Sequence, residues 1–304
     1  MMRSLFLFDM TFWLYLAALC LYVGYMVARR PILQLAPAGH PSGGAALGEN
    51  EWATQIGQVA TIITIFGWVV NTLALFTRAF ERMQLSGTFA PWSNQFEAMS
   101  YVSWAIILGY VLLEFRYHIK AIGAFVVGIG FIAMGAASLL PYRYQTAEPL
   151  VPALNSYWIY IHVSVTLTSY AAFAMAGGLG VMYLLKERAE RRGSRSGIFA
   201  SFPDLETIDE LGYKAIMVGF PLLAFGVILG AMWANYAWGG YWSWDPKETW
   251  SLIVWLIYGA YIHARMTRGW EGRRAAVYAI FGFLMVVFCF WGVNFLLSGL
   301  HAYA

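Results

Sequence analysis

The chain has 304 residues, of which 60% are hydrophobic and 12% are charged, and its formal net charge is +3. Soluble globular domains carry about 25% charged residues. The composition therefore excludes a soluble domain and predicts an all-α polytopic membrane protein. Because neither an internal repeat nor a separate hydrophilic domain is visible, we expect a single integral membrane domain over residues 1–304.

The first apolar run, residues 9–28, ends in Arg29-Arg30 without the small-residue cleavage pattern of a signal peptide, which favours a first membrane helix. In all, about eight stretches are long enough to cross a bilayer at a helical rise of about 1.5 Å per residue. They are residues 9–28, 55–77, 96–115, 119–140, 157–185, 214–236, 248–267 and 275–298.

The Lys and Arg residues are distributed unevenly among the connections. With the N-terminus placed outside, 14 of the 19 fall in inner loops and 5 lie on the outer side. Cytoplasmic loops carry an excess of Lys and Arg, so we expect both termini on the outer, periplasmic or lumenal, side. Residues 186–213 then form a cytoplasmic loop, and the Trp-rich loop between the sixth and seventh helices is external.

The segment 233–255 holds six of the chain's 14 Trp residues. An interfacial aromatic belt explains one or two Trp per helix end, whereas this density favours a platform for a large flat ligand. The Gly239-Gly240 pair allows a sharp turn or a close approach of the backbone. Asp245, Pro246 and Glu248 suit a helix start with Asp245 as the N-cap.

Two histidines are expected on the same face as this segment. His162 lies near the outer end of the fifth predicted helix, and His301 follows the last one. A histidine on an apolar helix is more often a hydrogen-bonded core residue than a metal ligand, but ionisable groups inside a membrane are costly and usually functional. Two neutral imidazoles are an ordinary haem ligand set, so the pattern indicates a haem site.

His263 lies deeper, about 22 Å along the seventh predicted helix from its outer end at the usual helical rise. It is too far from the Trp-rich loop to reach the same iron. If it binds metal, it binds a second haem near the cytoplasmic side. His118 is a candidate partner, although a histidine from another polypeptide fits better.

The run from Trp238 to Trp255 resembles the tryptophan-rich "WWD" signature of the haem-handling protein superfamily. Three further segments, Pro91–Glu97, Tyr258–Arg265 and Asn294–Tyr303, resemble its CcsA (ResC) branch, which serves the System II route of cytochrome c maturation. The resemblance extends from about residue 87 to the end of the chain.

The resemblance implies that His162 and His301 ligate haem b at the external site. It also implies that His263 helps to receive haem from the cytoplasmic side, with a counterpart histidine on a CcsB (ResB) partner subunit. Further implied partners are apocytochrome c and a thioredoxin-like thiol reductant, in a bacterial plasma membrane or a thylakoid membrane. The expected haem-binding residues are His162, His263, His301, Trp238, Trp242, Trp244, Asp245 and Trp250.

The expected function is haem delivery and attachment, as a subunit of a holocytochrome c synthase (haem lyase-like) complex. The chain would carry haem across the membrane and present it to the C-x-x-C-H segment of apocytochrome c, with the covalent chemistry supplied by haem and thiols. Asp245 and Glu248 could assist proton transfer. A b-type electron carrier is disfavoured because no helix bears two His about 13 residues apart. A haem exporter without an attachment role stays open.

Overall fold

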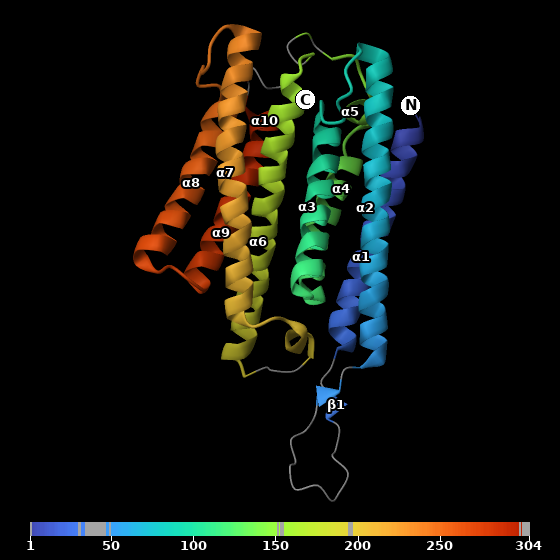
Figure 1. The fold of residues 1–304 in the computed structure, drawn as a ribbon, viewed down its shortest axis with the longest axis vertical. Helices are drawn as coiled ribbons and strands as arrows, with labels where there is room; N and C mark the ends of the chain where they lie inside the picture. The colour runs from blue at the N-terminus through green and yellow to red at the C-terminus, as the bar shows by residue number, and fades with distance from the viewer. Residues whose placement is uncertain are drawn as a thin grey trace, which may run out of the picture.

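The computed structural model describes residues 2–29, 32–33, 47–48, 50–150, 152, 155–193, 197–297 and 299. Long antiparallel helices form one bundle (Figure 1). The long helices are α1 (Met2–Ala28), α2 (Glu51–Ser86), α3 (Gln95–Tyr117), α4 (Gly123–Ser138), α6 (Ser164–Arg191), α7 (Leu205–Trp238), α8 (Pro246–Arg268) and α9 (Arg273–Val287).

Shorter elements connect or extend these helices. Two are π-helical: η3 (Ile159–Val163) leads into α6, and η5 (Phe288–Gly292) joins α9 to α10 (Val293–Leu296). The others are η1 (Lys120–Ile122), α5 (Tyr142–Gln145), η4 (Gly197–Ser201) and an antiparallel pair of two-residue strands, β1 (Ile32–Leu33) and β2 (Leu47–Gly48).

Within the described residues, seven helical segments are long and apolar enough to cross a membrane, which confirms an all-helical, multi-pass architecture. The eighth predicted span, 248–267, forms helix α8, but α8 is not among the seven. Its lower hydropathy follows from charged residues in both terminal turns: Lys247 and Glu248 at the start, and Arg265 and Arg268 at the end. The orientation of the bundle in the membrane stays a prediction.

The segment 186–213 contains more helix than a loop would. It includes the last turn of α6, the short η4 and the first turns of α7, which begins at Leu205 with Asp204 as its N-cap. Its cytoplasmic location stays a prediction.

Helix α6 is the central element of the bundle, and it packs against α3, α4, α7 and α9. Within its most apolar stretch 78% of the residues are buried, against 22% for α7. Small residues make this packing possible: a Cβ on Gly180 would lie 2.8 Å from the carbonyl oxygen of Ala276 on α9. Such close backbone approaches are typical of helix pairs in membranes.

Buried charged side chains hold the start of α3 in place. Arg82 donates to Glu97 at 2.7 Å and also to the carbonyl of Glu148, while Arg78 donates to the carbonyl of Gln145 at 2.7 Å. Ionisable groups at membrane depth are usually paired in this way. The cluster ties α2, the first turn of α3 and the α5 region together.

The start of α1, the α2–α3 connection, the α7–α8 connection and α10 all lie at one end of the bundle (Figure 1). We call this end the Trp end, because residues 239–245 of the Trp-rich segment lie there. The loop between α6 and α7 and the turn between α8 and α9 lie at the opposite end.

Candidate functional site

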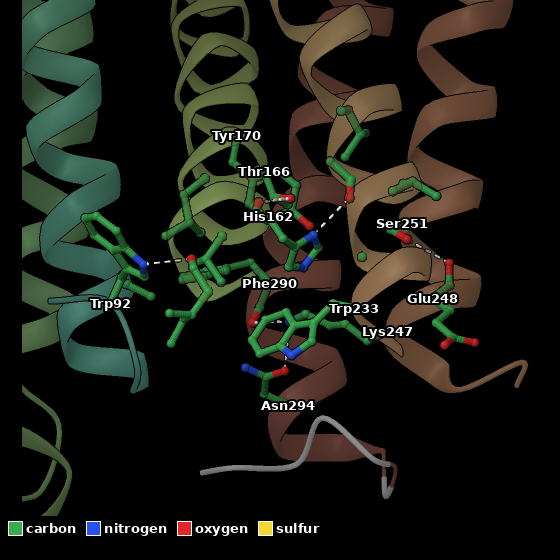
Figure 2. A pocket seen from close by; sticks show the side chains of 18 of the residues that line it. Trp92, His162, Thr166, Tyr170, Trp233, Lys247, Glu248, Ser251, Phe290 and Asn294 are labelled. Atoms are coloured by element: carbon green, nitrogen blue, oxygen red, sulfur yellow. Dashed lines mark hydrogen bonds between the residues drawn. The ribbon is translucent and has the colours of Figure 1, made fainter. Parts of the chain in front are cut away.

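A cavity of ≈ 200 Å³ lies at the Trp end, among α3, η3, α6, α7, α8 and η5 (Figure 2). Its walls are largely aromatic and aliphatic, and His162 is the one histidine among the described residues that line it. The aromatic side chains in the lining are Trp92, Tyr170, Trp233, Trp242 and Phe290.

The imidazole of His162 is oriented by the backbone of α7. Its Nδ1 lies 2.9 Å from the carbonyl oxygen of Gly226. A carbonyl only accepts hydrogen bonds, so Nδ1 carries a proton, and in the neutral form of the ring Nε2 then carries the lone pair. Histidines that ligate metals are commonly held in this tautomer by a carbonyl acceptor.

The facing side of α7 is shaped to accept this ring. Gly226, Gly230 and Trp233 follow one another on one face of the helix, at intervals of four and three residues. A Cβ on Gly230 would lie 2.7 Å from Cε1 of His162, closer than real Cβ atoms approach. Trp233 meets the imidazole edge to face, with ring centroids 5.7 Å apart. The position of His162 therefore depends on glycine at position 230.

Both π-helical segments border the cavity. η3 contributes Ile159 and His162, and η5 contributes Phe290. π-turns inside helices displace the backbone locally and are frequent at functional sites. In η5, the carbonyls of Cys289 and Phe290 accept hydrogen bonds from Nζ of Lys247 at 3.0 and 3.4 Å.

The start of α8 confirms the predicted N-cap. Asp245, which is 6% exposed, accepts from the backbone N–H of Lys247 at 3.0 Å, and the Glu248 carboxylate accepts from the N–H groups of Asp245 and Ser243. This reciprocal capping box rigidifies the end of the Trp-rich loop. Both carboxylates are thereby committed to the local backbone.

The structure brings only part of the predicted Trp platform to the cavity. Trp242 lines it, whereas Trp244 is 70% exposed and Trp238, at the end of α7, is 39% exposed. Trp244 also adopts a left-handed backbone with φ of 59°, which is unusual for a bulky residue. Trp250 packs against Phe288 with ring centroids 4.5 Å apart.

His301, the second predicted external ligand, lies outside the described residues, so its pairing with His162 stays a prediction. The chain is described at Gly299, two residues earlier. There a Cβ would collide with the carboxylate of Asp245 and approach the ring of Pro246 to 3.0 Å. Residue 299 therefore lies against the first turn of α8.

His263 lies in the last turns of α8, away from the cavity. Its side chain is exposed, and its ring has no hydrogen-bond partner within the part of the chain that the structure describes. It shares an exposed stripe of α8 with Leu256 and Ala260. His118, the other candidate for the deeper site, is exposed and ends α3 in a left-handed conformation.

Several cavity residues were not predicted individually. Trp92 donates from Nε1 to the carbonyl of Ile159 at 3.0 Å, and Gln95 is the first residue of α3. Lys247 donates to Oδ1 of Asn294 at 2.8 Å, and Nδ2 of Asn294 donates to Oε1 of Gln95 at 2.8 Å. All four lie in the segments that carry the family resemblance, but nothing in their local pattern indicates that they meet.

Lys247 is the one cation in the cavity lining among the described residues. Burial lowers the pKa of its ammonium below the ordinary lysine value, because desolvation disfavours the charged form, and the nearby charge of Asp245 opposes that shift. Its contacts with two carbonyls and an amide oxygen provide acceptors for all three of its protons.

Comparison with known proteins identifies relatives over most of the chain. A model of the family "Cytochrome C assembly protein" matches residues 92–301, a stretch that contains every cavity residue. The cytochrome c biogenesis protein CcsA of Guillardia theta is 43% identical over 256 residues, covering 79% of this chain and 83% of the relative. The CcsA protein of Synechococcus sp. (strain CC9902) is 42% identical over 257 residues, covering 77% and 84%.

Among solved structures, "Cytochrome c Heme Lyase CcmF" superposes with a TM-score of 0.61 at 18% identity. The match covers 96% of this chain and 49% of the other, so the chain spans about half the length of that protein. At this identity the similarity shows a common fold.

Proposed function

This chain belongs to the cytochrome c assembly protein family as a multi-pass membrane protein of cytochrome c biogenesis, and from that premise we propose that it binds haem b in the cavity at His162 and presents it to apocytochrome c. The observation that carries the proposal is the orientation of His162. Its ring is held by the Gly226 carbonyl against a wall of α7 that glycine keeps open.

The lining of the cavity suits a flat, largely apolar group with polar substituents. Aromatic rings from α3, α7 and the Trp-rich loop surround it, and two buried donors, Nε2 of Gln95 and Nε1 of Trp242, have no hydrogen-bond partner among the described residues. Buried donors are usually paired, so such orphans support a ligand that supplies acceptors. We propose that His301 would be the second imidazole that holds the haem, and the contact of Gly299 with the start of α8 supports that assignment.

When bound, haem supplies an iron that takes imidazole ligands and two vinyl groups to which the thiols of a C-x-x-C-H segment add. The chain's own residues hold and orient it. His162 would hold the iron through its imidazole, Trp92 and Trp242 would exclude water, and the exposed Trp238 and Trp244 would offer a surface for the acceptor polypeptide. A thioredoxin-like reductant would keep the acceptor thiols reduced.

We propose that His263 would hold haem at an earlier stage, on the cytoplasmic side, together with a histidine of a CcsB (ResB) partner subunit. Its exposed ring on a helix stripe supports an interface there. Both termini and the Trp end would then lie on the outer side of a bacterial plasma membrane or thylakoid membrane. The chain would act as part of a holocytochrome c synthase complex.

The test is the complex of this chain with its CcsB-type partner, purified from cells that express a cytochrome c. We expect His162→Ala to lower bound haem, measured by its absorption spectrum, and to abolish cytochrome c assembly. Added imidazole should restore part of both, because it occupies the vacated ligand position. Normal haem content and normal assembly in His162→Ala would contradict the proposal.

A further inference from the structure

A relay of hydrogen bonds connects α8, α10 and α3 beside the cavity. Figure 2 shows its first two members, Lys247 and Asn294. The relay starts at Lys247, which donates to Oδ1 of Asn294 at 2.8 Å, and continues from Nδ2 of Asn294 to Oε1 of Gln95 at 2.8 Å. Its last member, the amide nitrogen Nε2 of Gln95, is buried and has no partner among the described residues.

The direction of this relay is fixed by chemistry. A lysine ammonium has three donors and no acceptor, so Asn294 must turn its oxygen toward Lys247 and its NH₂ group toward Gln95. Gln95 must then turn its own oxygen toward Asn294. The NH₂ group of Gln95 is left over, and the buried charge of Lys247 thus determines that a donor, not an acceptor, remains at the α3 side.

Gln95 has few ways to satisfy this donor within the protein. The residue is 8% exposed, so water has little access to it. The nearby carboxylates are occupied elsewhere: Glu248 accepts from the backbone of the Trp-rich loop, and Glu97 accepts from Arg82 and Ser93. A donor left unpaired at this burial is costly.

Two further features of the cavity favour a negatively charged group. The indole Nε1 of Trp242, also in the lining, is a second buried donor without a partner in the described chain. In addition, α3 begins at Gln95, so the positive end of its helix dipole lies beside the cavity. The donors and the dipole are independent observations that point to the same ligand chemistry.

We propose that Gln95 and Trp242 form a subsite that binds a carboxylate of the ligand and that the Lys247–Asn294 relay keeps the Gln95 donor turned toward it. The inference rests on the proposed haem function, in which the carboxylate is a haem propionate. The propionates and the vinyl groups lie on different edges of the macrocycle. A propionate held at Gln95 therefore determines which edge faces away from α3, and so orients the vinyl groups.

The test uses the full chain in complex with its partner and two probes, haemin and haemin dimethyl ester, in which both carboxylates are esterified. The measured quantity is the ratio of their dissociation constants, from titrations followed at the Soret band. Partitioning of the ester into detergent is the same for every variant, so a change in this ratio reports the subsite alone.

In Gln95→Leu the preference for haemin over the ester should fall about tenfold relative to the unmodified chain, as expected for loss of a charge-assisted hydrogen bond. Asn294→Asp is the sharper variant, because a carboxylate keeps an acceptor for Lys247 but cannot donate to Gln95. The Gln95 amide is then free to turn its NH₂ group toward the introduced carboxylate, so the preference should fall although Gln95 is present. Gln58→Leu, at an exposed glutamine on α2, is the matched control and should leave the ratio unchanged.

An unchanged ratio in Gln95→Leu, or a retained preference in folded Asn294→Asp, would overturn the subsite while leaving haem binding at His162 intact. Failure of the unmodified complex to bind haemin in a His162-dependent manner would instead overturn the proposed function. The two failures are thus distinguishable.

Discussion

His162 and His263 differ in how deeply their helices are buried and in how their rings are held. His162 enters α6, the most deeply buried helix, through a π-turn, and α7 holds its ring by the Gly226 carbonyl and the gap at Gly230. His263 lies near the end of α8, which among the long helices of the described residues is the one that falls short of the hydropathy of a membrane span, and its ring is exposed. One histidine is oriented by its own chain, whereas the other faces outward.

This difference separates what the chain does alone from what needs a partner. A ligand that is already oriented loses little entropy when the metal binds. An exposed histidine gains nothing from its own fold, and an ionisable group facing lipid is costly unless another subunit covers it. We therefore expect the site at His162 to bind haem in the isolated chain and the site at His263 to require the assembled complex.

The largest effect is expected for His263→Ala in the complex. Cytochrome c assembly should be abolished, and haem at the His162 site should decline, because the supply route is interrupted. The free energy of unfolding should change by no more than about 0.5 kcal/mol, as for other exposed positions, in thermal melts of the isolated chain. Thr267→Ala, one turn further along α8, is the control and should assemble cytochrome c normally. Full assembly of cytochrome c in His263→Ala would show that the exposed histidine is not needed for haem supply.

Gly230→Ala should displace the oriented ring of His162. The added methyl would lie 2.7 Å from the His162 ring, and overpacking of this kind costs about 1–3 kcal/mol, so haem affinity should fall about tenfold or more. Alanine also improves helix propensity by about 1 kcal/mol, which makes the Soret band a better measure than the melting temperature. Gly240→Ala, where a Cβ meets no atom within 4 Å, is the matched control. Equal affinities in the two variants would show that α7 does not position the ring.

A smaller effect should distinguish two neighbouring indoles. Trp242 lines the cavity and Trp244 is largely exposed. Trp242→Ala should weaken haem retention by about 1–3 kcal/mol, the usual cost of removing a packed aromatic side chain, whereas Trp244→Ala should change it by less. Haem loss to apomyoglobin would measure both rates. A larger loss in Trp244→Ala would mean that the ligand binds on the exposed side of the Trp-rich loop.

Much of this architecture was predictable from local sequence. The apolar stretches mark the helices because a backbone in lipid must form its hydrogen bonds within the segment. Asp245-Pro246 with Glu248 marks the start of α8 because the capping box is a local interaction. The predicted membrane span at 248–267 is a helix, α8, but its hydropathy is too low for a candidate span. The aromatic and charged residues of the signature lower the apolar character of this helix.

The composition of the cavity was not predictable in the same way. Lys247 and Asn294 are far in the sequence from each other and from Gln95, and the three meet only because α3, α8 and α10 converge at the Trp end. The density of Trp residues predicted an aromatic site but not which rings line it, since that depends on the course of the loop after Gly239. The π-turns at His162 and Phe290 leave no signal that a helical period could detect.

The most direct test of the comparison is the haem stoichiometry of the purified chain, reconstituted with haemin alone and in complex with its CcsB-type partner. Pyridine haemochrome assays give the amount bound, and His162→Ala and His263→Ala assign it to a site. We expect one haem per chain in isolation, lost in His162→Ala and retained in His263→Ala, and a second haem, lost in His263→Ala, when the partner is present. Haem that binds the isolated chain through His263 and is indifferent to His162 would contradict the account.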